Sequence, residues 1–299
     1  MTTLHLGLDL GGTNIKVAVL EQENDSFRLV SNETVDTGAS AGPDGVAANL
    51  VAAGRTALTN SGAETVGLGV PGHFDPSNGR IKLFPNLPGP WPGFPLRNRL
   101  EDGLGMPVWM VNDARAFTLA EGVLGAGKGH GVVACITLGT GVGGGLMIDG
   151  KLHLGAFGVA GELGHQTIVP DGPLCGCGNR GCLEALIRSD VLTADAGRSS
   201  VEDVFVGARE GDQRCRIAIA RMTNYLGIGL ANVVAMFGTD RIIVGGGIAG
   251  AGDLILDPIR EAVKRHVTLV PTDKLEIVPA TFGRYAGAVG AALAGALRY

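Results

Sequence analysis

Aromatic and charged residues are scarce in this sequence, at 5% and 18% of its 299 positions. There is no basic block of five or more residues, and the net charge of -5 argues against a nucleic-acid-binding surface. Hydrophobic residues make up 45% and glycine contributes 50 residues, a composition that excludes a disordered chain and indicates many tight turns. Because single hydrophobic cores stop growing at roughly 250 to 300 residues, we expect two domains with a cleft.

Targeting signals are also missing. The N-terminal segment MTTLHLGLDLGG has no basic region, no apolar run of signal length and no cleavage site, so we expect the first strand of a cytoplasmic protein. One long uncharged stretch, residues 131–148, contains six glycines and predicts strand, turn and strand instead of a membrane helix. Cysteine is limited to five residues, three of them between Cys175 and Cys182, which favours a metal site in a reducing compartment over a disulfide framework.

Two segments share one plan, in which an apolar strand meets a second apolar strand at a glycine-rich turn. They are LHLGLDLGGTNIKVAVLEQE and VVACITLGTGVGGGLMIDGK. Strand and helix patterns alternate between and after them, which indicates an α/β fold with two lobes of similar design. We expect a small N-terminal lobe over residues 1–115, with the small-residue-rich helix 284–299 packing back on it, and a larger lobe over residues 116–283 that carries the metal site.

The two glycine turns are candidate phosphate-binding loops. Glycines 11 and 12 lack a Cβ, so their backbone N–H groups can approach an anion, and Thr13 adds a hydroxyl donor. Asp9 is expected to face the Mg²⁺ that accompanies the phosphates. The second turn would hold the polyphosphate from the opposite lobe, and a third turn, at Gly245–Gly247, suits a nucleotide base and ribose. The predicted nucleotide-binding residues are Asp9, Gly11, Gly12, Thr13, Asn14, Lys16, Gly139, Thr140, Gly141, Gly245, Gly246 and Gly247. Ordinary hairpin turns are the alternative.

Two other glycine patterns are rejected as nucleotide motifs. Glycines 139, 141 and 144 satisfy G-x-G-x-x-G, but a strand and not a helix is predicted to follow them. The segment ending in Lys128 approaches a P-loop, but position 129 is glycine instead of serine or threonine.

A compact cysteine and histidine pattern predicts a zinc site. His165, Cys175, Cys177 and Cys182 form H-x9-C-x-C-x4-C, and four such ligands can close a tetrahedron around Zn²⁺. Because the protein fills all four positions, we expect a structural and not a catalytic metal. Free thiols or a regulatory disulfide are the alternatives.

The motifs DLGGT, PGHF, PNLP, VNDA, GTGVGGG, AGELGH and CGCGNRGCLE, in this order, resemble the ROK family of sugar kinases and repressors within the actin-like ATPase superfamily. The resemblance covers essentially the whole chain. It implies a two-lobed, ribonuclease-H-like α/β fold with ATP and Mg²⁺ in an interdomain cleft, a structural Zn²⁺, and a homodimer or higher homo-oligomer. It implies a small-molecule sugar and ATP as partners. From the acidic net charge and the lack of a predicted membrane helix we expect no nucleic acid and no membrane as partners.

The resemblance also assigns the sugar site. It implies that Asp113 is the catalytic base, at a strand-to-helix junction where the helix dipole keeps the carboxylate ionised. The alternative for Asp113 is a simple helix N-cap. The implied sugar-binding residues are Gly72, Asn86, Asn112, Asp113, Glu162, His165 and Glu184. His165 belongs to the sugar and metal sets, which is consistent if one ring nitrogen binds zinc and the other meets the sugar. The proline-rich segment 75–96 is expected to be a long, irregular, functional loop.

The implied reaction is ATP-dependent phosphorylation of the 6-hydroxyl of a hexose, with glucose as the first expectation. N-acetylglucosamine, N-acetylmannosamine and fructose stay open as alternatives, because discrimination between sugars depends on the shape of the pocket. ATP instead of polyphosphate as donor is also an expectation. A sugar-responsive transcriptional repressor is the rival from another class, but Asp9 lies too near Met1 for a preceding helix-turn-helix domain. A catalytically inactive relative is opposed by the presence of Asp9 and Asp113.

Overall fold

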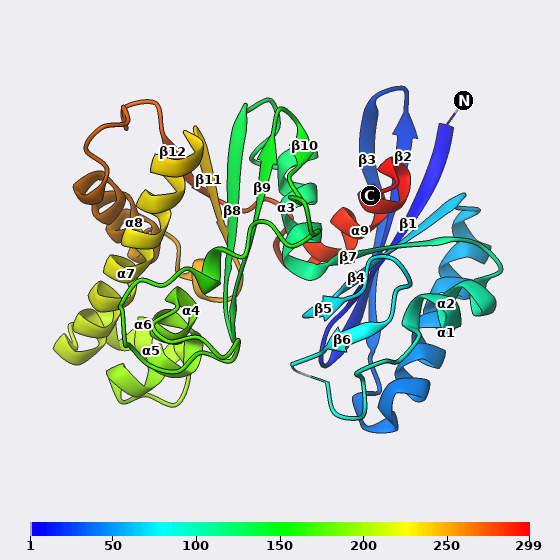
Figure 1. Ribbon diagram of the computed structural model, residues 1–299, viewed down its shortest axis with the longest axis horizontal. Coiled ribbons are helices and arrows are strands. Elements are labelled where there is room, and N and C mark those ends of the chain that lie inside the picture. Colours follow the sequence, from blue (N-terminus) through cyan, green and yellow to red (C-terminus); the bar gives the residue numbers. More distant parts are fainter. Residues whose placement is uncertain (1, 86) are drawn as a thin grey trace. The chain divides into compact units, whose positions relative to one another are not determined.

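The computed structural model describes residues 2–85 and 87–299 and divides into two compact units, each with its own five-stranded sheet (Figure 1). Unit 1 consists of Met1–Gly125 and Phe282–Tyr299, and unit 2 consists of Ala126–Thr281. The first boundary follows residue 125, beyond the expected 115, because helix α3 (Asp113–Val123) packs against helix α9 (Ala286–Leu297) inside unit 1.

The sheet of unit 1 has the order β3-β2-β1-β4-β7, in which β1 is antiparallel to β2 and parallel to β4, and β4 is parallel to β7. Among the described residues, the remaining elements of unit 1 are a two-stranded sheet of β5 and β6, four helices and two short 3-10 helices. Their bounds and those of the strands are β1 (Thr2–Leu10), β2 (Asn14–Glu23), β3 (Ser26–Asp36), η1 (Ala39–Ala41), α1 (Gly42–Ser61), β4 (Thr65–Val70), β5 (His73–Phe74), β6 (Ile81–Leu83), α2 (Leu96–Leu104), β7 (Val108–Asn112) and η4 (Gly283–Tyr285), with α3 and α9 as given above.

Helix α9 lies directly on one face of this sheet because glycines leave it room. A Cβ at Gly7 of β1 would lie 1.9 Å from the Ala288 carbonyl oxygen, and one at Gly67 of β4 would lie 1.7 Å from that of Ala291. The expected close packing of a small-residue-rich C-terminal helix is therefore observed. The opposite face forms a core with α1 from apolar side chains that include Leu6, Leu8, Val46, Leu50 and Leu68.

The sheet of unit 2 has the order β10-β9-β8-β11-β12. Its elements are β8 (Val132–Leu138), β9 (Val142–Ile148), β10 (Lys151–Leu152), η2 (Leu163–His165), α4 (Leu183–Ile187), α5 (Ser189–Ala196), α6 (Val201–Glu210), α7 (Gln213–Phe237), β11 (Arg241–Gly245), η3 (Ile248–Ala251), α8 (Asp253–His266) and β12 (Glu276–Pro279). The uncharged stretch 131–148 folds as β8, a turn and β9, as predicted. Helix α7 is long and apolar enough to cross a membrane, but 61% of its most apolar window is buried among α4, α5, α6 and α8, as in the core helix of a globular protein.

The proline-rich segment 75–96 is more ordered than an irregular loop. It contributes strand β6, and Trp91 within it is 1% exposed. The indole ring packs against Phe84 and Phe94, at centroid distances of 4.7 and 5.5 Å. This segment therefore forms part of the core of unit 1.

Candidate functional site

The first glycine turn joins β1 to β2. The Gly11 N–H donates to the Asn14 carbonyl at 3.0 Å, and a Cβ at Gly11 would lie 2.8 Å from the same oxygen, so the turn requires glycine there. Thr37 holds the turn with two hydrogen bonds: its N–H donates to the Thr13 carbonyl at 2.9 Å, and its hydroxyl donates to the Gly11 carbonyl at 2.8 Å. Sequence reasoning missed Thr37, because it lies far along the chain from the turn that it contacts.

Asp9 precedes this turn as a buried carboxyl group. Its Oδ2 lies 3.3 Å from the Nζ of Lys16, its partner across the β1–β2 pair, and only 7% of the residue is exposed. A Cβ on Gly287 of α9 would lie 2.5 Å from the carboxyl group, so glycine at that position makes room for it. Burial raises the pKa of Asp9, and the Lys16 ammonium opposes that rise. A carboxylate oxygen here is of the type that Mg²⁺ prefers.

Asn112 ends β7, and Asp113 is the first residue of α3. The Asn112 side-chain oxygen accepts from the backbone N–H of Ala114 at 3.0 Å, which makes Asn112 the N-cap. Asp113 is exposed, and its Oδ1 accepts from the same N–H at 2.8 Å. Asp113 therefore stands at the N-terminus of a helix that its neighbour caps, and the role of simple N-cap falls to Asn112.

The rest of the Asn112 side chain is also fixed. Its Nδ2 donates to the carbonyl of Gly72 at 2.9 Å, and the guanidinium of Arg115, a residue only 3% exposed, donates to its Oδ1 at 3.0 Å. Gly72 has φ +74°, and a Cβ there would lie 2.3 Å from the Leu83 carbonyl, so no other residue suits this position. Sequence reasoning missed Arg115. The predicted sugar ligand Asn86 lies outside the described residues.

These parts of unit 1 share one edge of its sheet. Strands β1, β4 and β7 are parallel, so their carboxyl ends, which lead to the first turn, to Gly72 and to Asp113, lie on the same side. In open α/β sheets this is the edge at which ligands bind. The sheet thus brings the predicted residues of unit 1 to one place.

The second glycine turn, residues 139–141, joins β8 to β9 in unit 2. The Gly139 N–H donates to the Gly141 carbonyl at 3.0 Å. Gly246, with φ +86°, packs on the end of β8, where a Cβ would lie 2.3 Å from the Leu138 carbonyl oxygen. The Gly245–Gly247 turn therefore lies beside the second glycine turn. Because strand β9 and not a helix follows the G-x-G-x-x-G pattern, the dinucleotide-binding interpretation is excluded, as predicted.

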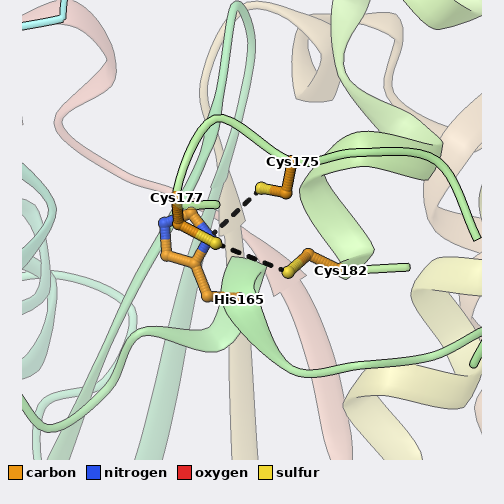
Figure 2. A group of neighbouring side chains, drawn as sticks. All are labelled: His165, Cys175, Cys177 and Cys182. Atoms are coloured by element: carbon orange, nitrogen blue, oxygen red, sulfur yellow. Dashed lines mark hydrogen bonds between the residues drawn. The ribbon is translucent and has the colours of Figure 1, made fainter. Parts of the chain in front are cut away.

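Figure 2 shows the predicted metal ligands His165, Cys175, Cys177 and Cys182 converging. Their ligand atoms all lie within 4.8 Å of one another. The Sγ atoms of Cys177 and Cys182 are 3.7 Å apart, and the Sγ of Cys175 is 3.6 Å from the Nδ1 of His165. In a tetrahedral zinc site these edges measure about 3.8 Å between sulfurs and about 3.6 Å between sulfur and nitrogen. The four ligands, here called the metal knot, therefore fit Zn²⁺.

Burial raises the pKa of the Cys175 thiol to about 12. A bound cation reverses this effect, because it stabilises the thiolate form that coordinates it. The chemistry of the donor set is therefore consistent with a metal that neutralises buried thiolates.

Two predicted sugar ligands lie against the metal knot. The His165 ring directs Nδ1 towards Cys175, whereas its Nε2 lies 3.8 Å from a carboxylate oxygen of Glu162. Glu184 lies 3.6 Å from the Cys175 sulfur through Oε1, and its Oε2 accepts from the Val142 N–H at 2.9 Å. Unit 2 thus gathers Glu162, His165 and Glu184 around the metal knot, next to the second glycine turn.

Comparison with known proteins extends these observations. The model of the ROK family matches residues 5–295. Glucokinase from Streptomyces coelicolor is 36% identical, over 97% of this chain and 96% of that protein. The solved ROK hexokinase from Thermus thermophilus is 36% identical with a TM-score of 0.85, over 100% of this chain and 99% of that one. The ROK family glucokinase from Streptomyces griseus, solved in complex with glucose and AMPPNP, is 34% identical with a TM-score of 0.81, over 98% and 99%. The matches run from end to end, and the chain belongs to the ROK family.

Proposed function

We propose that the protein is an ATP-dependent glucokinase, which transfers the γ-phosphoryl group of ATP to the 6-hydroxyl of glucose. The observation that carries this proposal is the likeness along the whole chain to a glucokinase solved with glucose and AMPPNP. The exposed carboxylate of Asp113, at the ligand-binding edge of the unit 1 sheet, supplies the group that such a reaction needs.

Asp113 acts as the base that accepts the proton of the sugar hydroxyl. Its place at the N-terminus of α3 favours the ionised form, because the partial positive charge of the helix end stabilises an anion. Phosphoryl transfer passes through a loose transition state, so correct placement of the hydroxyl matters more than a strong base. The bonds from Asn112 to Gly72 and Arg115 support a fixed position for the residue next to this base.

The sugar is held by Gly72, Asn86, Asn112, Asp113, Glu162, His165 and Glu184. Carboxylates and amides at several positions can pair with adjacent hydroxyls and so select one stereochemistry. The Nε2 of His165 is the ring nitrogen turned away from the metal knot and towards Glu162, which supports its contact with the sugar.

The nucleotide is held by the two glycine turns, with Gly245–Gly247 under its base and ribose, and Asp9 faces Mg²⁺. Thr13 and Thr140 are exposed residues in glycine turns, which supports this assignment, since N–H groups in such turns bind phosphate oxygens. Burial of the Asp9 carboxylate beside the first turn destabilises the fold, and a bound cation would offset this destabilisation by neutralising the charge.

The metal knot holds a structural Zn²⁺. The protein supplies all four ligands, so the metal fixes the chain between His165 and Cys182 and keeps no open position for a reactant. We further propose that the protein is cytoplasmic and forms a homodimer or higher homo-oligomer, the assembly being what the family resemblance implies. Light scattering on the purified protein would give its mass in solution.

An ADP-release assay over a sugar panel tests the proposal. Purified protein is supplied with MgATP and glucose, fructose, N-acetylglucosamine or N-acetylmannosamine, and Asp113→Asn serves as the blank. We expect the highest kcat/KM with glucose. A higher kcat/KM with an N-acetylhexosamine or fructose would make that sugar the preferred substrate instead of glucose. ADP release that does not depend on any sugar would contradict the assignment as a sugar kinase. Polyphosphate in place of ATP tests the donor.

A further inference from the structure

A short segment of unit 2 links the metal knot to the second glycine turn. It runs from Cys182 to Ser189, contains helix α4, and is called here the α4 segment. Its first residue is a predicted metal ligand and the N-cap of the helix. The opposite end of the segment lies at the glycine turn, because the Ser189 N–H donates to the Gly139 carbonyl at 2.9 Å.

The α4 segment also holds the other end of the turn. The Glu184 carboxylate accepts from the Val142 N–H at 2.9 Å, and a Cβ at Gly141 would lie 2.8 Å from the same oxygen. One segment thus bonds to the first residue of the turn, Gly139, and to the residue directly after it, Val142. The turn is exposed, and beyond the β8–β9 pairing at its base the bond between Gly139 and Gly141 closes it, so these two bonds add to the restraints on its conformation.

The metal knot restrains the α4 segment in turn. Cys182 is 0% exposed and its Sγ lies 3.7 Å from that of Cys177, while the Cys175 sulfur lies 3.6 Å from the second oxygen of Glu184. A metal bound by Cys182 would fix the start of α4, and with it the position on the helix from which the Glu184 side chain extends. Cys175 donates to Glu184 only as a thiol, so the metal-bound thiolate does not make that bond.

We propose that the α4 segment is a positioning element for nucleotide binding, which transmits occupancy of the metal knot to the second glycine turn through Glu184 and the Ser189 N–H. The inference rests on the proposed function, because it takes this turn to be a phosphate-binding loop. It predicts that metal loss weakens nucleotide binding even in the absence of sugar, although the knot itself holds no nucleotide.

Ser189→Pro is the sharpest variant, because it deletes one N–H donor. Proline is tolerated at the first position of a helix, which Ser189 occupies in α5, and Arg188 before it is already extended at φ -62° and ψ 161°. Loss of one hydrogen bond of ordinary strength should raise the Kd for MgADP about fivefold. The matched control is Gln213→Pro, at the exposed first position of α7, for which no change is expected.

Glu184 gives an independent test. Glu184→Ala removes the acceptor of the Val142 N–H and should raise the Kd for MgADP by roughly tenfold or more, since the acceptor is charged. Glu184→Gln retains an acceptor oxygen and should restore nucleotide affinity to within about twofold while glucose affinity stays reduced. A purely structural role for Glu184 would not separate the two ligands in this way.

The experiment measures MgADP binding by calorimetry without sugar, together with hydrogen exchange of the 139–145 backbone, on zinc-loaded protein, on metal-free protein and on the four variants. Faster exchange and weaker MgADP binding in the metal-free protein, in Ser189→Pro and in Glu184→Ala support the proposal. Wild-type MgADP affinity in zinc-loaded Ser189→Pro and Glu184→Ala overturns it, whether or not the metal-free protein stays folded. If the zinc-loaded wild-type protein itself binds no MgADP, the proposed function fails instead.

Discussion

Gly290 lies on the side of α9 that contacts α3, and its replacement by alanine should displace Asp113. A Cβ there would lie 1.7 Å from the Ala116 carbonyl oxygen of α3. Real Cβ atoms essentially never approach within 3.0 Å, so the two helices would have to separate by about 1.3 Å. Helix α9 cannot yield towards the sheet, because it is already in contact there at Gly7 and Gly67.

The displacement therefore falls on α3, whose first residue is Asp113. A misplacement of about 1 Å at a reacting group can cost about 100-fold in rate, and overpacking of a core typically costs about 1–3 kcal/mol of stability. We expect Gly290→Ala to fold, to lose about 1–3 kcal/mol in urea unfolding, and to lose about 100-fold in kcat with glucose at saturating substrates.

The control is Gly131→Ala, the same chemical change at an exposed glycine whose added Cβ would be 3.8 Å from the nearest atom. It should match the wild-type protein in both measurements. A Gly290→Ala protein with wild-type kcat and stability would refute the reasoning, because it would show that the α3–α9 contact does not position Asp113.

Three further predictions concern single side chains. Asp113→Asn should keep glucose affinity in calorimetry but lose about 10²- to 10⁴-fold in kcat, and near-normal turnover would remove Asp113 from its role as base. Asp9→Asn should raise the melting temperature and reduce MgATP-dependent turnover. Burial raises the pKa of Asp9 above 3.8, so the stability of the wild-type protein falls as the pH rises from 3.8 through the folded-state pKa. The variant cannot ionise at this position, and its stability should not show this fall. Burial lowers the pKa of His5 below 6.5, so the unfolded state takes up the proton first and stability is lost as the pH falls from 6.5 towards the folded-state pKa. His5→Gln should reduce that loss, measured by urea unfolding at several pH values. Equal pH profiles for the variant and the wild-type protein would contradict a lowered pKa for His5.

Much of the architecture could be predicted from local sequence. The strand, glycine turn and strand pattern around Thr13 and around Thr140 is a short-range signal, and the structure has both hairpins. The metal knot also follows from spacing, because glycines around Cys175, Cys177 and Cys182 allow the thiols to converge. The junction at Asn112 and Asp113 could also be predicted from local sequence, because a strand pattern runs there directly into a helix pattern.

Contacts between distant residues were not predictable in this way. Nothing in the sequence around Thr37 indicates that it secures the turn at Gly11, and nothing around Arg115 indicates that it supports Asn112 from a buried position. Trp91 is buried although its segment is rich in proline, because packing on Phe84 and Phe94 outweighs the local preference for loop. That the Thr13 and Thr140 turns hold one triphosphate beside Asp113 stays a prediction.

Identification of the product tests the account most directly. Zinc-loaded protein is incubated with MgATP and glucose, and the phosphorus and proton NMR spectra of the mixture are followed over time. The account predicts glucose phosphorylated on its 6-oxygen, formed in step with ADP at a turnover on the order of 1–100 s⁻¹. Release of inorganic phosphate without any sugar phosphate, or phosphorylation at another hydroxyl, would contradict it.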